Sequence, residues 1–317
     1  MLVVVIGNES CLEYWEYKKG EISQSFKSQP VPNEISRVVI SGANEKASVF
    51  MAQGAQIRGF TRKGKEFFKL DTNHTEQIAQ LHVQGMSLWS AGAYTLNCYA
   101  SSNNSIQDKY YYLCDDKINE MVVTQLVPEH QESSAVLACN DGSIKVISDG
   151  GKLLYSTVLD AAPMTIALVE DEETVSKAKV ICYGLQNGNI GAAELGLDES
   201  IILWEVELGG RAPVQILRVA LIKDKPHVVL VRDDSTIEVH KFLEGQKTIG
   251  KAEQMFSIKE KEAITGIAVG NFTSAIRKEI LISCFSGAIK TLVDKKHAKK
   301  LGTLTEDAIN MSEAQLN

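Results

Sequence analysis

The stretch AVLACNDGSIKVI, residues 135–147, decides the fold. Its first half is an apolar run that ends in a turn at residues 140–142, where Asn, Asp and Gly tolerate a positive φ. Beyond the turn, Ile144 and Val146 alternate with polar residues, which is the period of a β-strand. The stretch therefore predicts a β-hairpin.

The same module returns along the whole sequence. Each copy has a short β-branched run, a turn of Gly, Asn, Asp or Ser, and an alternating run that contains Ile or Leu. From Leu12 to Ile289 the aliphatic residue after the turn recurs in six steps, at about 46 residues per step. This spacing is typical of four-stranded propeller blades. The seven copies are LVVVIGNESCLEYW, VFMAQGAQIRGF, LWSAGAYTLNCY, AVLACNDGSIKVI, VICYGLQNGNIGAA, VVLVRDDSTIEVH and ILISCFSGAIKTL.

The predicted fold is all-β, a seven-bladed β-propeller over residues 1–293. Helical repeats of similar length would need long stripes of period 3.6, whereas the local period here is two. The first copy begins at residue 2, which leaves an incomplete first blade as an open alternative. Residues 294–317 are expected to be a linker and the start of a helix or coiled coil, with Thr305 as the helix N-cap.

The stretch GFTRKGKE, residues 59–66, resembles the phosphate-binding P-loop but has Glu66 where that loop needs Ser or Thr. A P-loop also opens into a helix. The repeat instead places Gln56–Thr61 on one strand and Lys65–Leu70 on the returning strand. We therefore predict a hairpin with Gly64 in its turn, and no nucleotide site.

Composition indicates an ordinary globular protein of 317 residues, with 44% apolar and 23% charged positions. The formal net charge of −7 argues against nucleic acid as a partner. The start, MLVVVIGNES, lacks the features of a signal peptide, and no apolar run approaches the about 18 residues of a membrane span. The expected protein is soluble and cytoplasmic.

The residue types that carry most enzyme chemistry do not cluster in the sequence. The six cysteines include no C-x-x-C pair, and the six histidines form no H-E-x-x-H or H-x-H group. The loop at residues 273–278 follows a G-N-F stretch like that of calcium-binding propellers, but it has no carboxylate. We predict no catalytic, cofactor-binding or metal-ligating residues, and isolated buried thiols.

Two further segments have more than one interpretation. The run Tyr110-Tyr111-Tyr112 fits a recognition surface, but we favour a strand with two of its rings packed between blades. The lysine-rich run at residues 295–300 fits contact with anionic lipid, but a solvated linker is favoured because it has no amphipathic apolar partner.

Two long blocks carry a resemblance to a known family. They are GAQIRGFTRKGKEFFKLDTNHTEQI, residues 54–78, and KYYYLCDDKINEM, residues 109–121. Here the chain resembles the Bardet-Biedl syndrome 7 family, subunits of the BBSome coat complex of cilia. The order of the blocks and the matched repeats extend the resemblance over nearly the whole chain. The W-D dipeptides of generic WD repeats are absent.

The resemblance implies a seven-bladed propeller that a coiled coil, an appendage-like β domain, a platform and helices follow in the family. It implies a non-catalytic scaffold that supports membrane-protein trafficking to and from cilia. The implied partners are other BBSome subunits, notably a related propeller subunit paired through the coiled coil, and an Arf-like small GTPase near the propeller. The implied places are the cytoplasm, cytoskeleton, cilium, ciliary membrane periphery, basal body and centriolar satellites, with membrane reached only through the complex.

One alternative stays beside the scaffold, a propeller enzyme. Propellers also host hydrolases and lyases whose residues converge on a central channel from different blades, so clustered carboxylates or histidines there would favour an enzyme. A channel lined by small or apolar residues would favour the scaffold. A secreted, calcium-dependent adhesion propeller is disfavoured because both a signal peptide and D-x-D-x-D loops are missing.

Overall fold

A computed structural model describes most of the chain. The described residues are 2–8, 10–18, 21–42, 47–85, 87–102, 105–126, 132–169, 179–208, 211–222, 225–241, 253–272 and 278–292. Every regular element in these ranges is a β-strand, so the all-β class is confirmed and none of the described segments is a helix that could cross a membrane. The predicted C-terminal helix, the lysine-rich run and most of the 273–278 loop lie outside the described residues.

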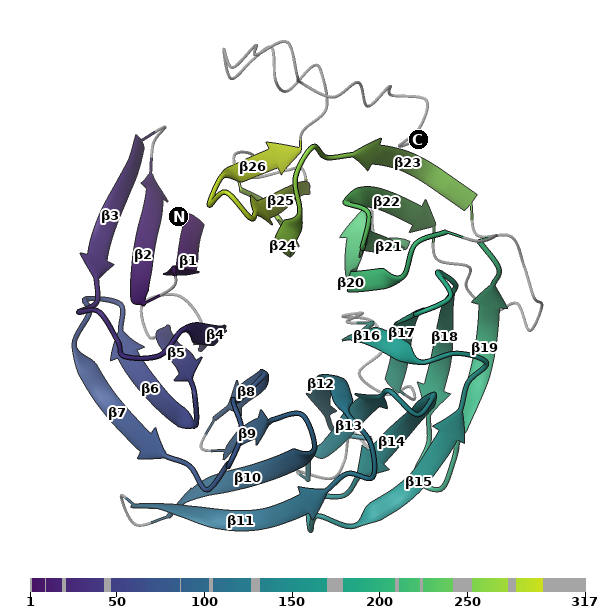
Figure 1. The fold of residues 1–317 in the computed structure, drawn as a ribbon, viewed down its shortest axis with the longest axis horizontal. Coiled ribbons are helices and arrows are strands. Elements are labelled where there is room, and N and C mark those ends of the chain that lie inside the picture. Colours follow the sequence, from purple (N-terminus) through teal and green to yellow (C-terminus); the bar gives the residue numbers. More distant parts are fainter. Residues whose placement is uncertain are drawn as a thin grey trace. The chain divides into compact units, whose positions relative to one another are not determined.

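The described strands form seven sheets, five of four strands and two of three. In each sheet the strands lie side by side in chain order (Figure 1). Neighbours run antiparallel, as in the pairs β5–β6 and β17–β18. This order is that of consecutive hairpins, which is how a propeller blade is built.

The strand bounds, sheet by sheet, are as follows. The first three sheets contain β1 (Leu2–Asn8), β2 (Cys11–Lys18) and β3 (Glu21–Lys27); β4 (Ile35–Ser41), β5 (Ser48–Gln53), β6 (Gln56–Thr61) and β7 (Glu66–Asp71); and β8 (Gln80–Gln84), β9 (Ser87–Ala91), β10 (Thr95–Ser102) and β11 (Ser105–Leu113). The fourth contains β12 (Ile118–Thr124), β13 (Ser134–Cys139), β14 (Ser143–Ile147) and β15 (Leu153–Val158). The last three contain β16 (Pro163–Leu168), β17 (Lys179–Leu185), β18 (Ile190–Leu195) and β19 (Ser200–Val206); β20 (Val214–Ile222), β21 (Lys225–Arg232), β22 (Thr236–Lys241) and β23 (Glu253–Lys259); and β24 (Ile264–Gly270), β25 (Glu279–Cys284) and β26 (Ile289–Leu292).

The chain divides into two compact units. The first unit is Met1–Val123, Ser134–Asp141 and Lys145–Leu154, and it contains the first three sheets. The second unit is Thr124–Ser133, Gly142–Ile144 and Tyr155–Asn317, and it contains the last three sheets. The fourth sheet contributes residues to both units.

Each of the seven repeated modules forms one hairpin in a different sheet. The module that decides the fold, residues 135–147, lies on β13 and β14. The other six form the pairs β1–β2, β5–β6, β9–β10, β17–β18, β21–β22 and β25–β26. The predicted succession of seven modules is therefore present, with three described strands in the first and last sheets.

The P-loop-like stretch forms the hairpin between β6 and β7. The N–H of Gly64 donates to the Thr61 carbonyl at 2.9 Å, and the N–H of Thr61 donates to the Lys65 carbonyl at 2.8 Å. Gly64 has a φ of 81°, a conformation that glycine adopts without a steric cost. The predicted hairpin is confirmed, with the returning strand beginning at Glu66 and not at Lys65.

A backbone hydrogen bond recurs where the outer strand of a sheet ends. At that point an N–H donates to a carbonyl in or beside the turn between the second and third strands of the same sheet. The pairs are Thr72 to Ala55, Cys114 to Tyr94, Leu159 to Gly142 and Glu260 to Ser235, at 2.8–3.0 Å. The bond satisfies polar backbone atoms at the chain's departure from each sheet, and so fixes where the next connection begins.

The core of each unit consists of apolar clusters shared by neighbouring sheets. In the first unit, Trp89 and Leu96 of one sheet pack with Met121 and Leu137 of the next. In the second unit, Ile190 and Leu230 belong to one cluster in the same way. Sheets that share apolar faces depend on their neighbours for burial, which is the energetic basis of a repeat fold.

Candidate interaction surface and buried polar clusters

The tyrosine run lies on β11, the outer strand of its sheet. Tyr110 and Tyr112 pack against the buried cluster of that sheet and the next, and the indole N–H of Trp89 donates to the Tyr110 hydroxyl at 3.2 Å. Tyr111 and Leu113 have the opposite parity and are 57% and 62% exposed. The favoured interpretation, two packed rings, therefore agrees with the structure, and the third ring remains on the surface.

Tyr111 and Leu113 share one face of β11, opposite Asn97 and Thr95 of β10. In the part of the chain that the structure describes, β11 pairs with β10 on one edge only. An edge strand with exposed apolar side chains offers both unpaired backbone groups and contact area to another protein. Tyrosine is also enriched among residues that dominate binding energy. We call Tyr111 and Leu113 the β11 surface.

His74 is the centre of a polar cluster between β7 and β10. Its Nδ1 lies 2.7 Å from the Thr95 hydroxyl and its Nε2 lies 2.8 Å from the Ser90 hydroxyl. Glu76 accepts hydrogen bonds from the Thr95 hydroxyl and from the backbone N–H of Tyr94. Burial lowers the pKa of His74, so the ring is neutral at pH 7.

The His74 cluster contains the residue types of a serine hydrolase but not its arrangement. In such an enzyme the carboxylate orients the histidine and the serine is open to substrate. Here Glu76 contacts Thr95 and a backbone N–H, and Ser90 is fully buried. The cluster instead connects the β7–β8 connection to β9 and β10, which is a structural role.

The second unit contains a buried charge cluster around Glu238 on β22. Its carboxylate accepts hydrogen bonds from Arg232 at 3.0 Å, Arg211 at 2.5 Å and His240 at 2.7 Å. Arg232 and Glu238 are each 2% exposed. Burial alone would raise the pKa of Glu238, but the hydrogen bonds from His240 and Arg232 lower it to about 2. The carboxylate is therefore ionised and paired with the two guanidinium groups.

A third polar cluster, in the first unit, joins the first strands of the second, third and fourth sheets. Arg37 of β4 contacts Gln80 of β8 and lies 3.1 Å from the Glu120 carboxylate of β12. The Gln80 amide donates to the Asn119 carbonyl at 3.0 Å. The Glu120 carboxylate is thus paired with a guanidinium, and the cluster links these first strands to one another.

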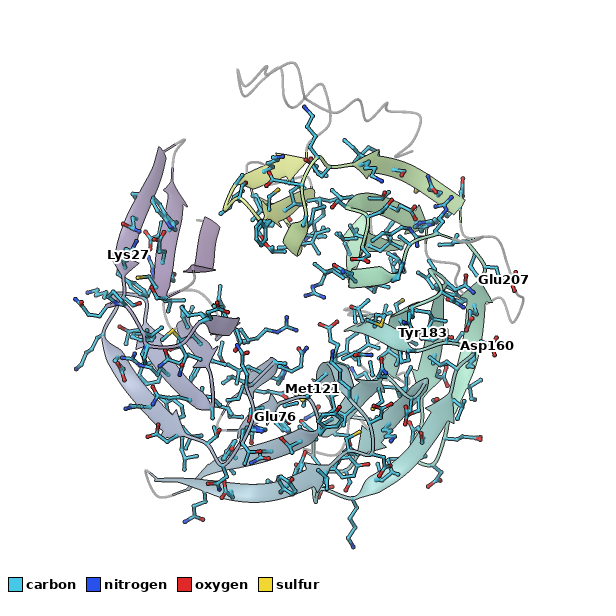
Figure 2. The ribbon with its side chains drawn as sticks, viewed as in Figure 1. Lys27, Glu76, Met121, Asp160, Tyr183 and Glu207 are labelled. Carbon is cyan, nitrogen blue, oxygen red and sulfur yellow. The ribbon has the colours of Figure 1, made fainter. Side chains whose placement is uncertain are left out.

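An acidic group surrounds Tyr183 in the second unit, where Figure 2 labels Asp160, Tyr183 and Glu207. The Tyr183 hydroxyl donates to the Glu205 carboxylate at 3.1 Å. Burial raises the pKa of Glu205, and the nearby Asp160 and Glu207 raise it further. In the described ranges no three His, Cys, Asp or Glu side chains are placed to hold a metal ion.

A thiol pair lies beside a buried lysine in the first unit. The Cys114 and Cys139 sulfur atoms are 3.5 Å apart, and the Lys145 ammonium is 4.0 Å from the Cys114 sulfur. Lys145 also contacts the carboxylates of Asp115 at 3.2 Å and Asp141 at 3.1 Å. Burial alone would lower the pKa of Lys145, but the two carboxylates raise it, so the side chain carries its charge.

Sequence reasoning missed these buried polar groups. Lys145, Glu238 and His240 occupy the polar positions of alternating strands, yet all three are buried. The spacing of Asp141 and Lys145 across one hairpin was a signal for an ion pair. Cys114 follows β11 and Cys139 ends β13 of the next sheet, and nothing in the sequence connects them. The prediction of isolated buried thiols is therefore wrong for this pair, although all six cysteines are buried.

A family model described as "BBS7 beta-propeller" matches residues 2–293. The chain belongs to this family. The match confirms the β-propeller fold and the resemblance drawn from the two sequence blocks.

Curated relatives agree with the family. The chain is 28% identical over 316 residues to the "BBSome complex member BBS7" of Mus musculus, covering 97% of this chain and 42% of the mouse protein. It is 27% identical over 300 residues to the "BBSome complex member bbs-7" of Caenorhabditis elegans, covering 92% of this chain and 40% of that protein. The chain therefore spans less than half the length of these relatives.

Solved structures share the fold of this BBS7-family propeller. Two crystal structures of BBS1N in complex with ARL6DN, one soaked with mercury and one with lead, each give a TM-score of 0.65. The sequence identities are 13% and 12%, and each comparison covers 91% of this chain and 86% of the other. At this identity the likeness concerns the fold alone.

Proposed function

We propose that this chain is the propeller of a BBSome coat subunit and acts as a non-catalytic scaffold. In this role it supports the trafficking of membrane proteins to and from cilia by binding other proteins. Its family and its curated relatives, both BBSome members, support the assignment. A fold does not specify function by itself. The remaining support for the proposal comes from the β11 surface and the polar clusters.

The observation that carries the proposal is the contrast between the polar clusters and the β11 surface. The clusters around His74, Glu238 and Arg37 use their polar groups to connect strands. The β11 surface instead presents Tyr111 and Leu113 to solvent on an edge strand. Exposed aromatic and aliphatic groups at an edge favour protein binding over chemistry.

The proposed partners are other BBSome subunits, notably a related propeller subunit paired through a coiled coil. The proposed setting is the cytoplasm and the cilium, with contact to the ciliary membrane through the complex. We also propose an Arf-like small GTPase near the propeller. Support for the GTPase comes from the fold neighbour BBS1N, whose crystals contain ARL6DN.

Affinity purification of the protein in its native full length from ciliated cells tests this function. We expect the wild type to bring down other BBSome subunits. The double variant Tyr111→Ser/Leu113→Ser should reduce recovery of at least one subunit about tenfold or more, because truncating central contacts costs about 2 kcal/mol or more. Loss of these exposed side chains should leave folding intact.

Val158→Ser is the matched control, since Val158 is also exposed, at 76%, on the outer strand β15. This variant should recover every subunit at the wild-type level. Equal recovery with the double variant and the wild type would contradict the role of the β11 surface. Absence of all coat subunits from the wild-type purification would contradict the scaffold itself.

A further inference from the structure

The Cys114–Cys139 pair differs from an ordinary contact between buried thiols because a cation adjoins it. Cys114 follows β11 and Cys139 ends β13, and the two residues are 3% and 0% exposed. Two thiols alone would pack as small apolar groups. The ammonium of Lys145, only 5% exposed at its side chain, adds a positive charge 4.0 Å from the Cys114 sulfur. A cation in this position favours a thiolate.

The electrostatic surroundings assign different states to the two sulfurs. The hydrogen bond between the two sulfurs lowers the pKa of Cys114; burial opposes this, and Lys145 adds to it. The same hydrogen bond, together with burial, raises the pKa of Cys139. The Lys145 ammonium, 4.0 Å from the Cys114 sulfur, favours the thiolate on Cys114 and leaves the proton on Cys139. A low-pKa thiolate beside a second thiol is the arrangement of redox-active pairs.

The other buried cysteines provide a contrast within the same chain. Burial raises the pKa of Cys98 to about 12, and it also raises the pKa of Cys182 and Cys284. These three side chains remain neutral thiols, which react slowly with oxidants. Oxidation is therefore expected at the Cys114–Cys139 pair and not at these three cysteines.

Cys114 directly precedes an exposed residue. The side chain of Asp115 is 86% exposed and contacts the same ammonium at 3.2 Å, whereas Cys114 itself is 3% exposed. A small neutral oxidant such as hydrogen peroxide suits this position better than a bulky disulfide.

We propose that Cys114 and Cys139 form a redox-modification site, with Cys114 as the attacking thiolate, Cys139 as the resolving thiol and hydrogen peroxide as the oxidant. The Cys114 sulfur attacks one peroxide oxygen, so an S–O bond forms and the O–O bond breaks. The departing hydroxide takes a proton from solvent and leaves as water. Cys114 is then a sulfenic acid.

The second step closes the disulfide. The Cys139 sulfur attacks the sulfenic sulfur, so an S–S bond forms and the S–O bond breaks. The released hydroxide takes the Cys139 proton and leaves as a second water. The two sulfurs together lose two electrons, and the peroxide is reduced to water. The sulfur atoms must approach by about 1.5 Å to reach disulfide length.

The disulfide would connect the end of one sheet to a central strand of the next. Such a link restricts the unfolded chain and should raise the thermal midpoint of the first unit. A dithiol reductant would reverse the change. This inference does not depend on the proposed scaffold function, since it concerns chemistry inside the fold.

Peptide mass spectrometry on the full-length protein tests the proposal. The native protein is treated with hydrogen peroxide, its remaining thiols are alkylated, and its peptides are compared with and without dithiothreitol. We expect a reducible cross-link between Cys114 and Cys139, while Cys98 and Cys182 remain fully alkylated. Unmodified Cys114 and Cys139 after peroxide treatment, or irreversible oxidation of Cys114 without the cross-link, would overturn the proposal.

Two variants separate the roles of the sulfurs. Cys139→Ser should stop the reaction at a Cys114 sulfenic acid that dimedone traps, and Cys182→Ser should form the cross-link as the wild type does. If dimedone labels Cys139 in a Cys114→Ser variant at the same rate, the assigned attacking thiol is wrong. The wild-type measurement stands by itself should a variant fail to fold.

Discussion

The Glu238 carboxylate accepts hydrogen bonds from Arg232, Arg211 and His240 while only 2% of the residue is exposed. Removing one charge from such a cluster leaves its partner buried without compensation. We predict that Glu238→Gln lowers the free energy of unfolding by about 3–5 kcal/mol. Urea denaturation measures the loss.

Glu253→Gln is the control for this variant. Glu253 lies on the adjacent strand β23, with a side chain that is 67% exposed and 3.7 Å from Lys241. The control should change stability by less than about 1 kcal/mol, since exposed ion pairs contribute little. Similar losses in both variants would mean that burial of the Glu238 cluster does not determine its contribution.

The same carboxylate predicts a pH dependence. The pKa of Glu238 is about 2 in the folded chain and 4.5 ordinarily, so its ionised form favours folding. This contribution, about 3 kcal/mol, is complete above pH 4.5 and is lost as the pH falls toward 2. Urea midpoints between pH 5 and 2 should fall more steeply for the wild type than for Glu238→Gln. Parallel curves would contradict the depressed pKa.

The burial of individual polar side chains was the least predictable part of the fold. Lys145, Glu238 and His240 alternate with apolar neighbours. From the period of a β-strand, such residues are expected on an exposed polar face. Their burial follows from partners on other strands or turns, such as Asp115 for Lys145 and Arg232 for Glu238. A single sequence does not reveal such distant pairs, whereas it does reveal the period of each strand.

At the scale of elements, the hairpin turns were predictable because their chemistry is local. Gly64, Gly188 and Gly287 all have positive φ, as the turns between strand-forming runs required. The first strand of each later sheet, from β4 to β24, was not assigned from the repeat, since its sequence varies and its connection differs in length. Pairing, not local pattern, defines those strands.

Two turn glycines predict different costs of substitution. Gly188 and Gly287 have φ values of 87° and 84°, so alanine strains the backbone at both. A Cβ at Gly188 would also lie 2.5 Å from the Arg211 carbonyl oxygen, whereas a Cβ at Gly287 meets nothing within 4 Å. We predict losses of about 2–4 kcal/mol for Gly188→Ala and about 1 kcal/mol for Gly287→Ala.

Thermal or urea unfolding of the two alanine variants measures this difference. Because both positions lie in turns between the second and third strands of propeller sheets, each variant is the control for the other. Equal losses would show that the left-handed conformation alone sets the cost, and that the carbonyl of Arg211 yields without a penalty.

At the scale of the whole molecule, the sequence predicted the class and the repeat, and the family model and the structure agree with both. The proposed scaffold function depends on the family and on which residues stay exposed. The sequence favoured two packed rings in the tyrosine run, and the structure shows that Tyr110 and Tyr112 are the packed ones and Tyr111 the exposed one. The period of a strand tells which residues share a face, but neighbouring sheets decide which face is covered.

Quantitative mass spectrometry of the native complex tests the central claim most directly. The tagged protein, at its full length and native level, is isolated from ciliated cells, and the amounts of co-isolated proteins are measured relative to it. We predict other BBSome subunits in fixed, near-equal proportion to this one. Recovery of the folded protein without those subunits would contradict the account.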